Sequence, residues 1–117
     1  MPKASTCVVI LMLLLVSVTP AVQAAPASGV VTRYPVPGSP YRVAMEAPGR
    51  VWATLPAQNA IASVVVSPSG AFDVRAYTLP TAGSEPYDIA FGGGAVWVTE
   101  RLGNKIARFD PATQGWT

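Results

Sequence analysis

From about residue 40 onward, the chain alternates short apolar segments with turns. The apolar segments are 4 to 7 residues long, are rich in Val, Ile, Tyr, Phe and Trp, and are separated by Gly, Pro, Ser or Asn, which is typical of β-strands. No window has apolar residues at the spacing of an amphipathic helix over three turns. The pattern therefore predicts an all-β domain.

The predicted strands form two series in the same order, preceded by one separate strand. The separate strand is expected at 30–36, the first series at 41–46, 50–54, 61–66 and 72–79, and the second series at 87–91, 95–99 and 105–109. The sequence "DPATQGWT" follows the last of these and stops where a fourth strand of the second series would begin. We expect the second series to have three strands.

The two series are copies of one repeat. The segment "GRVWAT" at 49–54 recurs as "GAVWVT" at 94–99, and Asn59 and Ile61 recur 45 positions later as Asn104 and Ile106. A period in the forties is typical of stacked supersecondary units. Four antiparallel strands in about 45 residues are what a beta-propeller blade requires. The predicted fold class is therefore all-β, with propeller blades that form an incomplete ring.

A blade cannot bury both of its faces alone, so residues at the repeated apolar positions are expected to pack between blades. These structural core residues are Trp52, Trp97, Ile61 and Ile106. A tryptophan pair could instead form a platform for a ligand, but the equivalent mid-strand positions of Trp52 and Trp97 favour blade packing.

The first 24 residues have the features of a secretory signal peptide. Lys3 precedes an apolar run from Val8 to Val18, and small residues at Val22 and Ala24 suit a processing enzyme that cuts after Ala24. The run is shorter than the roughly 20 apolar residues that span a bilayer, although an uncleaved anchor is the alternative. We therefore expect a secreted or extracytoplasmic protein with no membrane span, in which residues 25–117 form the partial propeller.

The charge of residues 25–117 excludes some partners. One Lys and six Arg face six carboxylates, so the net charge is about +1 and gives no electrostatic case for nucleic acid. The only cysteine, Cys7, lies in the expected signal peptide, and no disulfide is therefore expected in the mature domain. The sequence does not identify the ligand of the chain.

The C-terminal 41 residues resemble one propeller family. The stretch "YTLPTAGSEPYDIAFGGGAVWVTERLGNKIARFDPATQGWT" is similar to a blade of the streptogramin (virginiamycin B) lyase-like propellers, and the segment from Arg33 is similar more loosely. The resemblance implies a C–O lyase that opens a cyclic depsipeptide by elimination, with a histidine base and a carboxylate that binds Mg²⁺. The family also contains many uncharacterised secreted proteins.

The catalytic residues of that family cannot be carried over to this chain. The sequence contains no His, which is the usual base near neutral pH, and no series of acidic residues that would form a metal loop. We therefore expect a truncated, secreted member that acts as a binding or scaffold module without catalysis of its own. The alternative is part of a streptogramin B lyase-type enzyme whose catalytic blades are missing or are supplied by assembly, and only then is Mg²⁺ expected.

Candidate ligand-binding residues follow from the geometry of a propeller. The loop that enters the first strand of a blade and the loop between its second and third strands emerge on the same face, near the central channel. Among the residues there, those that differ between the repeats, such as Arg42 and Asp88, are freer to serve a ligand, although solvated surface charge is the simpler interpretation. The candidates are Tyr41, Arg42, Tyr87, Asp88, Glu100 and Arg101.

Two blades cannot close a ring, because closed propellers usually have 4 to 8. The chain therefore needs further blades or self-association. Three or four copies would give six or eight blades, and the competing explanation is a reading frame that was cut short. In that case the exposed blade faces favour aggregation.

Overall fold

The computed structural model describes residue 29 and residues 31–117. The chain divides into two units, Met1–Thr32 and Arg33–Thr117. The expected signal peptide at 1–24 lies outside the described residues, and the fold below is that of the second unit. Within the described part of the chain, no helix has the length and hydropathy needed to cross a membrane.

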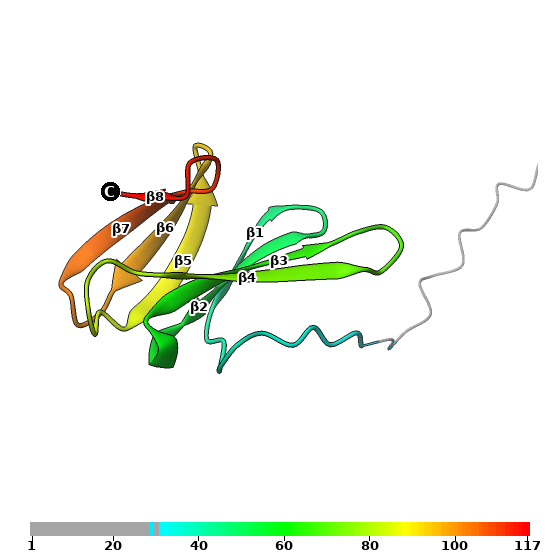
Figure 1. Cartoon of the computed structure of the whole chain (residues 1–117), viewed down its shortest axis with the longest axis horizontal. Coiled ribbons are helices and arrows are strands. Elements are labelled where there is room, and N and C mark those ends of the chain that lie inside the picture. The colour runs from blue at the N-terminus through cyan, green and yellow to red at the C-terminus, as the bar shows by residue number, and fades with distance from the viewer. Residues whose placement is uncertain (1–28, 30) are drawn as a thin grey trace, which may run out of the picture. The chain divides into compact units, whose positions relative to one another are not determined.

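The second unit contains two four-stranded antiparallel sheets (Figure 1). The first sheet has the order β1-β2-β3-β4, and the second has the order β5-β6-β7-β8. The strands of the first sheet are β1 (Val43–Ala47), β2 (Arg50–Leu55), β3 (Ala60–Val66) and β4 (Phe72–Thr78). Those of the second are β5 (Pro86–Gly92), β6 (Ala95–Glu100), β7 (Lys105–Asp110) and β8 (Gly115–Trp116). A single 3-10 turn, η1 (Pro56–Gln58), joins β2 to β3.

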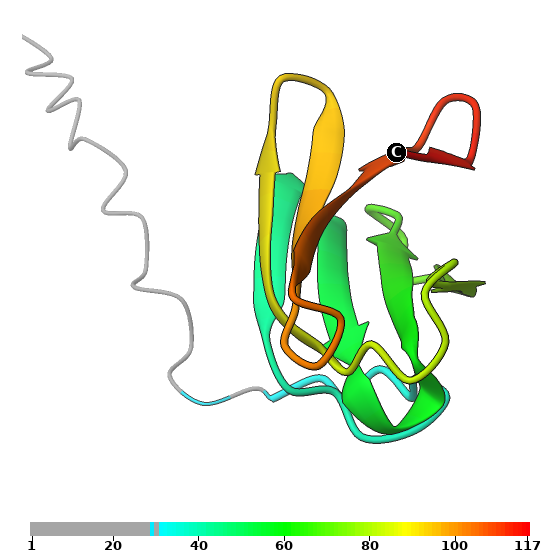
Figure 2. The same ribbon diagram turned by 90° about the vertical axis from the view of Figure 1, so that its left-hand side faces the viewer.

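Both sheets follow the chain in sequential order, so each strand pairs with the next through a short connection. The predicted fold class is confirmed: each sheet is a meander of the kind that forms a propeller blade. The strand bounds agree with the predicted bounds to within about two residues. β1 and β5, the first strands of the two sheets, lie next to each other (Figure 2).

Two expectations about strands were wrong. Residues 31–36 form no strand, and Val30 lies outside the described residues. Pro35 and Pro37 lack backbone donors, and Tyr34 and Val36 instead pack against Phe72 and Leu55 of the first sheet.

The second sheet also has a fourth strand, whereas three strands were predicted from the sequence. The short strand β8 pairs with the end of β7, with Trp116 opposite Phe109. Backbone hydrogen bonds of 2.7 and 2.9 Å between Arg108 and Thr117 extend this pairing. The Phe109 and Trp116 rings, 4.8 Å apart, hold the strand against the sheet.

The main core lies between the two sheets. Val96, Val98 and Phe109 of the second sheet are completely buried and pack in one cluster with Trp52 and Ile61 of the first. The Trp52 ring centroid lies 5.7 Å from that of Phe109, in an edge-to-face arrangement. The alternation of side chains along a strand explains this choice, because Val96 and Val98 point to one face of β6 and Trp97 to the other.

The four expected core residues divide into two pairs. Trp52 and Ile61 are 2% and 0% exposed, whereas Trp97 and Ile106 are 43% and 67% exposed. Trp97 and Ile106 are therefore exposed among residues 31–117, and their packing against a further blade stays a prediction. The physical reason is that the face of the second sheet on which they lie has no third sheet against it among residues 31–117.

The link between the two sheets is held by the residue that follows η1. Asn59 has a left-handed backbone, with φ 51°, which asparagine tolerates better than most residues. Its side chain donates to the carbonyl oxygens of Leu79 and Thr81 and accepts from Ser84. One asparagine of the first sheet therefore fixes the path of the chain into the second.

Candidate functional site

Tyr41 and Tyr87, which occupy equivalent positions before or at the start of the first strand of each sheet, are in direct contact. Their hydroxyl oxygens lie 2.8 Å apart, and their ring centroids lie 4.8 Å apart. Tyr41 is half exposed and Tyr87 is partly buried. The two sheets thus bring two of the predicted ligand-binding residues into one aromatic pair.

The pair changes the acidity of one phenol. The hydrogen bond between the Tyr41 and Tyr87 side chains raises the pKa of Tyr41 above its ordinary value of 10.0, and the partial desolvation of the phenol adds to this. The guanidinium of Arg42 acts in the opposite direction and more weakly. Tyr41 is therefore a neutral phenol that can donate or accept a hydrogen bond at physiological pH.

Two arginines lie over these rings. The guanidinium carbon of Arg42 is 5.0 Å from the centroid of the Tyr41 ring, and that of Arg101 is 5.4 Å from the centroid of the Tyr87 ring. Both distances allow a cation–π interaction. Arg101 is also held by Glu85, whose Oε1 lies 2.6 Å from Arg101 Nη2. We call these four residues, Tyr41, Arg42, Tyr87 and Arg101, the tyrosine–arginine cluster.

A buried threonine positions the cluster. Thr54 Oγ1 accepts a hydrogen bond from the backbone N–H of Arg42 at 3.0 Å and donates one to the carbonyl oxygen of Tyr87 at 3.2 Å. Because Thr54 is completely buried, this hydroxyl links the entry segments of both sheets without water. Thr54 recurs as Thr99 in the second repeat, but no sequence pattern predicts this contact between the sheets.

Asp88 lies outside the tyrosine–arginine cluster. Its Oδ1 accepts a hydrogen bond from the backbone N–H of Ile89 at 2.9 Å, and its own N–H donates to Thr99 Oγ1 at 2.9 Å. With Trp97 and Ile106 it lines a cavity of about 180 Å³ on the exposed face of the second sheet. Among residues 31–117, Asp88 therefore makes no hydrogen bond or ion pair with Arg101, which pairs with Glu85 instead.

Glu100 is buried, unlike the other candidates. It is 4% exposed, and its Oε2 has no hydrogen-bond partner among residues 31–117. Gly103 lies directly over this oxygen, at a distance that leaves no room for a Cβ atom. Glu100 also lines two cavities with Lys105 and Ile106, of about 270 and 390 Å³. An unpaired buried carboxylate is costly, which makes Glu100 the most unusual polar group of the fold.

A charged groove, which sequence reasoning missed, lies between β3–β4 and the turn that leads into β8. It has a volume of about 340 Å³, and Trp52 and Tyr77 line it together with Arg50, Asp73 and Arg75. Arg75 pairs with Asp73 at 2.8 Å.

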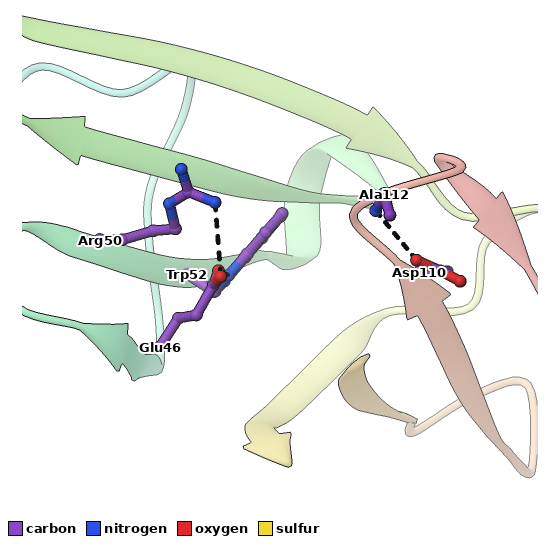
Figure 3. Close-up of polar contacts among 5 residues, drawn as sticks. All are labelled: Glu46, Arg50, Trp52, Asp110 and Ala112. Atoms are coloured by element: carbon purple, nitrogen blue, oxygen red, sulfur yellow. Dashed lines mark hydrogen bonds and ion pairs between the residues drawn. The ribbon is translucent and has the colours of Figure 1, made fainter. Parts of the chain in front are cut away.

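Glu46 fixes the indole at this groove. Its Oε2 accepts a hydrogen bond from Trp52 Nε1 at 2.7 Å, while its Oε1 lies 3.4 Å from Arg50 (Figure 3). On the opposite side, Asp110 Oδ1 accepts from the backbone N–H of Ala112 and shapes the turn. A difference between the repeats could have predicted this groove: Arg50 and Arg75 correspond to the uncharged residues Ala95 and Thr117 of the second repeat.

The described residues do not provide a site for Mg²⁺. In this part of the chain, no three or more His, Cys, Asp or Glu side chains come together in a group that could hold a metal ion. A Mg²⁺ site needs oxygen ligands from several groups, and Glu100 belongs to no such group in the described part of the chain.

No protein-family model matches the chain. A curated relative does: virginiamycin B lyase of Nocardia farcinica (strain IFM 10152) is 37% identical over 82 residues, which cover 70% of this chain and 28% of the relative.

Solved structures agree in fold and in sequence. The streptogramin B lyase structure has a TM-score of 0.57 at 28% identity, and a catalytically inactive virginiamycin B lyase from Staphylococcus aureus with quinupristin has a TM-score of 0.56 at 32% identity. Both alignments cover 67% of this chain and 25% of the other. The chain belongs to the virginiamycin B lyase-like family.

This virginiamycin B lyase-like chain spans about a quarter of the length of the relatives that it matches. Its two sheets are therefore comparable to two blades of a larger propeller. The tyrosine–arginine cluster lies where the entry segments of those two blades meet.

Proposed function

We propose that the chain is a secreted, virginiamycin B lyase-like propeller segment that binds a ligand at the tyrosine–arginine cluster and does not catalyse a reaction by itself. The observation that carries the proposal is the contact between Tyr41 and Tyr87, which is capped on each ring by an arginine. Two aromatic rings and two guanidinium groups on one exposed surface favour a ligand with flat apolar parts and carbonyl oxygens.

The geometry of the cluster supports binding for a second reason. Thr54 and Glu85 hold the backbone and the side chains of the cluster in place before a ligand arrives, through the bonds to Arg42, Tyr87 and Arg101. A preorganised site loses less conformational entropy on binding than a flexible one.

The ligand class follows from the relatives. One solved relative is a virginiamycin B lyase with quinupristin. Since this chain is 32% identical to that protein over 67% of its own length, a molecule of the quinupristin type is the first ligand to test.

A second candidate function is a part in a streptogramin B lyase-type reaction. The names of the relatives and the unpaired buried carboxylate of Glu100 favour it. In that case the base, and any Mg²⁺ site, would come from blades other than the two described here, because this sequence contains no His and the described residues have no metal-holding group.

Calorimetric titration of the purified chain with quinupristin tests the proposal. We expect measurable binding in the wild-type chain and an affinity reduced about tenfold or more in Tyr41→Ala, since tenfold corresponds to about 1.4 kcal/mol. Tyr34→Ala is the matched control, because Tyr34 packs on Phe72 and is not part of the cluster. Absence of binding by a folded wild-type chain, or an equal loss in both variants, would contradict the proposal.

Chromatography of the same mixtures separates the two candidate functions. Elimination opens the ring of a cyclic depsipeptide without changing its mass, whereas hydrolysis adds one water. We expect quinupristin to be recovered unopened. Catalytic ring opening by the chain alone would contradict the non-catalytic proposal and favour the second candidate.

A further inference from the structure

The contact between the two sheets shows what one sheet needs from the next. The first sheet presents Trp52, Thr54 and Ile61 on one face, and each of these residues is at most 2% exposed beneath the second sheet. The covering face of the second sheet includes Ile89, which is 8% exposed, and Phe91, which is partly buried. We call the first surface the tryptophan face and the second the β5 face.

The second sheet has a tryptophan face of its own, and no other part of residues 31–117 covers this face. The repeat places Trp97, Thr99 and Ile106 at the positions of Trp52, Thr54 and Ile61. Trp97 is 43% exposed, Ile106 is 67% exposed, and Thr99 is also exposed.

The first sheet has a counterpart of the β5 face, of which the β1 part is exposed. Val43 and Met45 of β1 occupy the positions of Ile89 and Phe91 of β5, and both are 69% exposed. We call them the β1 face. Behind them, Ala62 is already buried and packs with Val36 of the same chain. Val36 corresponds to Leu79, which belongs to the internal interface. The chain therefore exposes the tryptophan face of one half, and the β1 face of the other half, of an interface that it also contains once in complete form.

We infer that the uncovered tryptophan face of one copy binds the uncovered β1 face of a second copy, head to tail, and repeats the contact between the two sheets of a single chain. The occupant is a second copy because the same chain carries the two complementary surfaces and the internal interface shows how they fit. The contact continues an existing interface, because the residues of the tryptophan face are identical in the two repeats and the β1 face has apolar residues at the positions of Ile89 and Phe91.

Polar groups at the rim fit the same arrangement. Inside one chain, Thr54 Oγ1 donates to the Tyr87 carbonyl, and Asn59 accepts hydrogen bonds from Ser84. In the assembly, Thr99 would donate to the carbonyl of Tyr41 in the second copy, because Tyr41 corresponds to Tyr87. The segment "GSPY" at 38–41 repeats the "GSEPY" at 83–87, so Ser39 of the second copy would meet Asn104 as Ser84 meets Asn59.

Asn104 is already in the conformation that this contact needs. Its φ of 54° is close to the 51° of Asn59, but its side chain is exposed. A head-to-tail contact closes into a ring when its rotation divides a full turn without a rise, as it does between the blades of a propeller. Each copy contributes two sheets, so three or four copies form a ring of six or eight blades, within the usual range of about 4 to 8.

Sedimentation analysis of the purified full chain tests this inference. We expect a species of three or four times the chain mass. Ile106→Asp and Val43→Asp, which each place a charge in one half of the interface, are expected to give monomers, with an association constant reduced about 100-fold or more. Both side chains are exposed in the single chain, so both variants should keep the circular dichroism spectrum of the wild type.

Mixing the two variants reveals the direction of the contact. The Val43→Asp chain keeps an intact tryptophan face, and the Ile106→Asp chain keeps an intact β1 face, so the mixture should form a complex of one chain of each kind and nothing larger. Leu102→Asp is the control: Leu102 is 67% exposed in the loop between β6 and β7, where the equivalent Ala57 stays exposed next to the second sheet. This variant should assemble as the wild type does.

Several results would overturn the inference. A monomeric wild-type chain would show that these faces do not bind each other and would leave them to other blades. A dimer that is broken by Ile106→Asp but not by Val43→Asp would show a symmetric contact of two tryptophan faces. Failure of the two variants to form a mixed complex, or aggregates of undefined size that both variants leave unchanged, would also exclude the head-to-tail contact.

Discussion

Asn59 holds Ser84 by two hydrogen bonds to the same oxygen, although the residues are 25 positions apart: Asn59 Oδ1 accepts from the Ser84 N–H at 2.9 Å and from the Ser84 hydroxyl at 2.6 Å. The Nδ2 of Asn59 donates to Thr81 O at 2.8 Å. Ser84 is completely buried, so its backbone N–H and its hydroxyl depend on this one carboxamide for hydrogen bonds.

Replacement of Asn59 by alanine should destabilise the chain strongly. The variant loses the bonds to Ser84 and Thr81 and places a Cβ-bearing residue without a polar side chain in a left-handed conformation, so we expect a loss of about 2–4 kcal/mol in the free energy of unfolding. Asn104→Ala is the matched control, because Asn104 has the same conformation but an exposed side chain. Only the conformational cost of about 1 kcal/mol is expected there.

Urea unfolding followed by tryptophan fluorescence measures both variants. Each should be made in an Ile106→Asp background, where assembly cannot add to the stability of either asparagine. Equal losses in the two variants would show that the hydrogen bonds to Ser84 and Thr81 contribute nothing.

Alanine substitution of the two repeated tryptophans should also cause different losses of stability. Trp52 is buried against Phe109 and Tyr77, with centroids 5.7 and 5.9 Å away, whereas Trp97 is 43% exposed. In the same monomeric background, Trp52→Ala should cost about 3–5 kcal/mol and Trp97→Ala about 1 kcal/mol or less. If Trp52→Ala does not fold, Trp52→Phe is measured in its place by urea unfolding. A larger loss at Trp97 than at Trp52 is incompatible with the assignment of faces.

The sequence predicted the sheets because alternation and turn residues are local signals. It also predicted that Tyr41, Arg42, Tyr87 and Arg101 would meet at one end of the sheets, since the repeat fixes equivalent positions in space. The contact of the two hydroxyls and the bridge through Thr54 depend on how one sheet rotates against the next, which no local pattern reports.

Burial could not be predicted from the repeat alone. Trp52 and Trp97 occupy the same position of the repeat, but among residues 31–117 only Trp52 has a sheet over it. Residues 31–36 have the apolar character of a strand, but a strand needs a partner edge, and Tyr34 and Val36 pack on side chains instead. Burial of a tryptophan and formation of a strand both depend on a neighbour in space, which a local sequence pattern does not report.

Glu100→Leu should stabilise the fold. The equivalent residue of the first sheet is Leu55, which is completely buried, so the position accommodates an aliphatic side chain of similar size. Removal of a buried oxygen without a partner should add about 1–3 kcal/mol to the free energy of unfolding, measured by urea titration.

Glu100→Gln is the control for this change, because it keeps the shape and leaves polar atoms in the same buried position. It should be much less stabilising than Glu100→Leu. A loss of stability in Glu100→Leu would mean that the carboxylate has a structural partner in solution. If Glu100→Leu is more stable but binds quinupristin more weakly, the carboxylate is retained for function at the expense of stability.

The contact between the tyrosines predicts a pH dependence. The hydrogen bond with Tyr87 raises the pKa of Tyr41 above 10.0, which means that the folded chain favours the neutral phenol. The stabilisation of the fold by this hydrogen bond is therefore fully present below pH 10 and is lost as the pH rises through the raised pKa of Tyr41. Ultraviolet absorbance of tyrosinate in the folded chain should show one phenol that ionises later than a free tyrosine.

Tyr87→Phe should move the pKa of Tyr41 down, because it removes the hydroxyl that is the largest cause of the shift but keeps the ring at 4.8 Å. The guanidinium of Arg42, which lowers the pKa, stays in place. The change should appear as a difference between the absorbance titrations of the two chains. An unchanged titration of Tyr41 in Tyr87→Phe would show that the two hydroxyls are not bonded in solution, and the tyrosine–arginine cluster would then lose the contact that holds it across the two sheets.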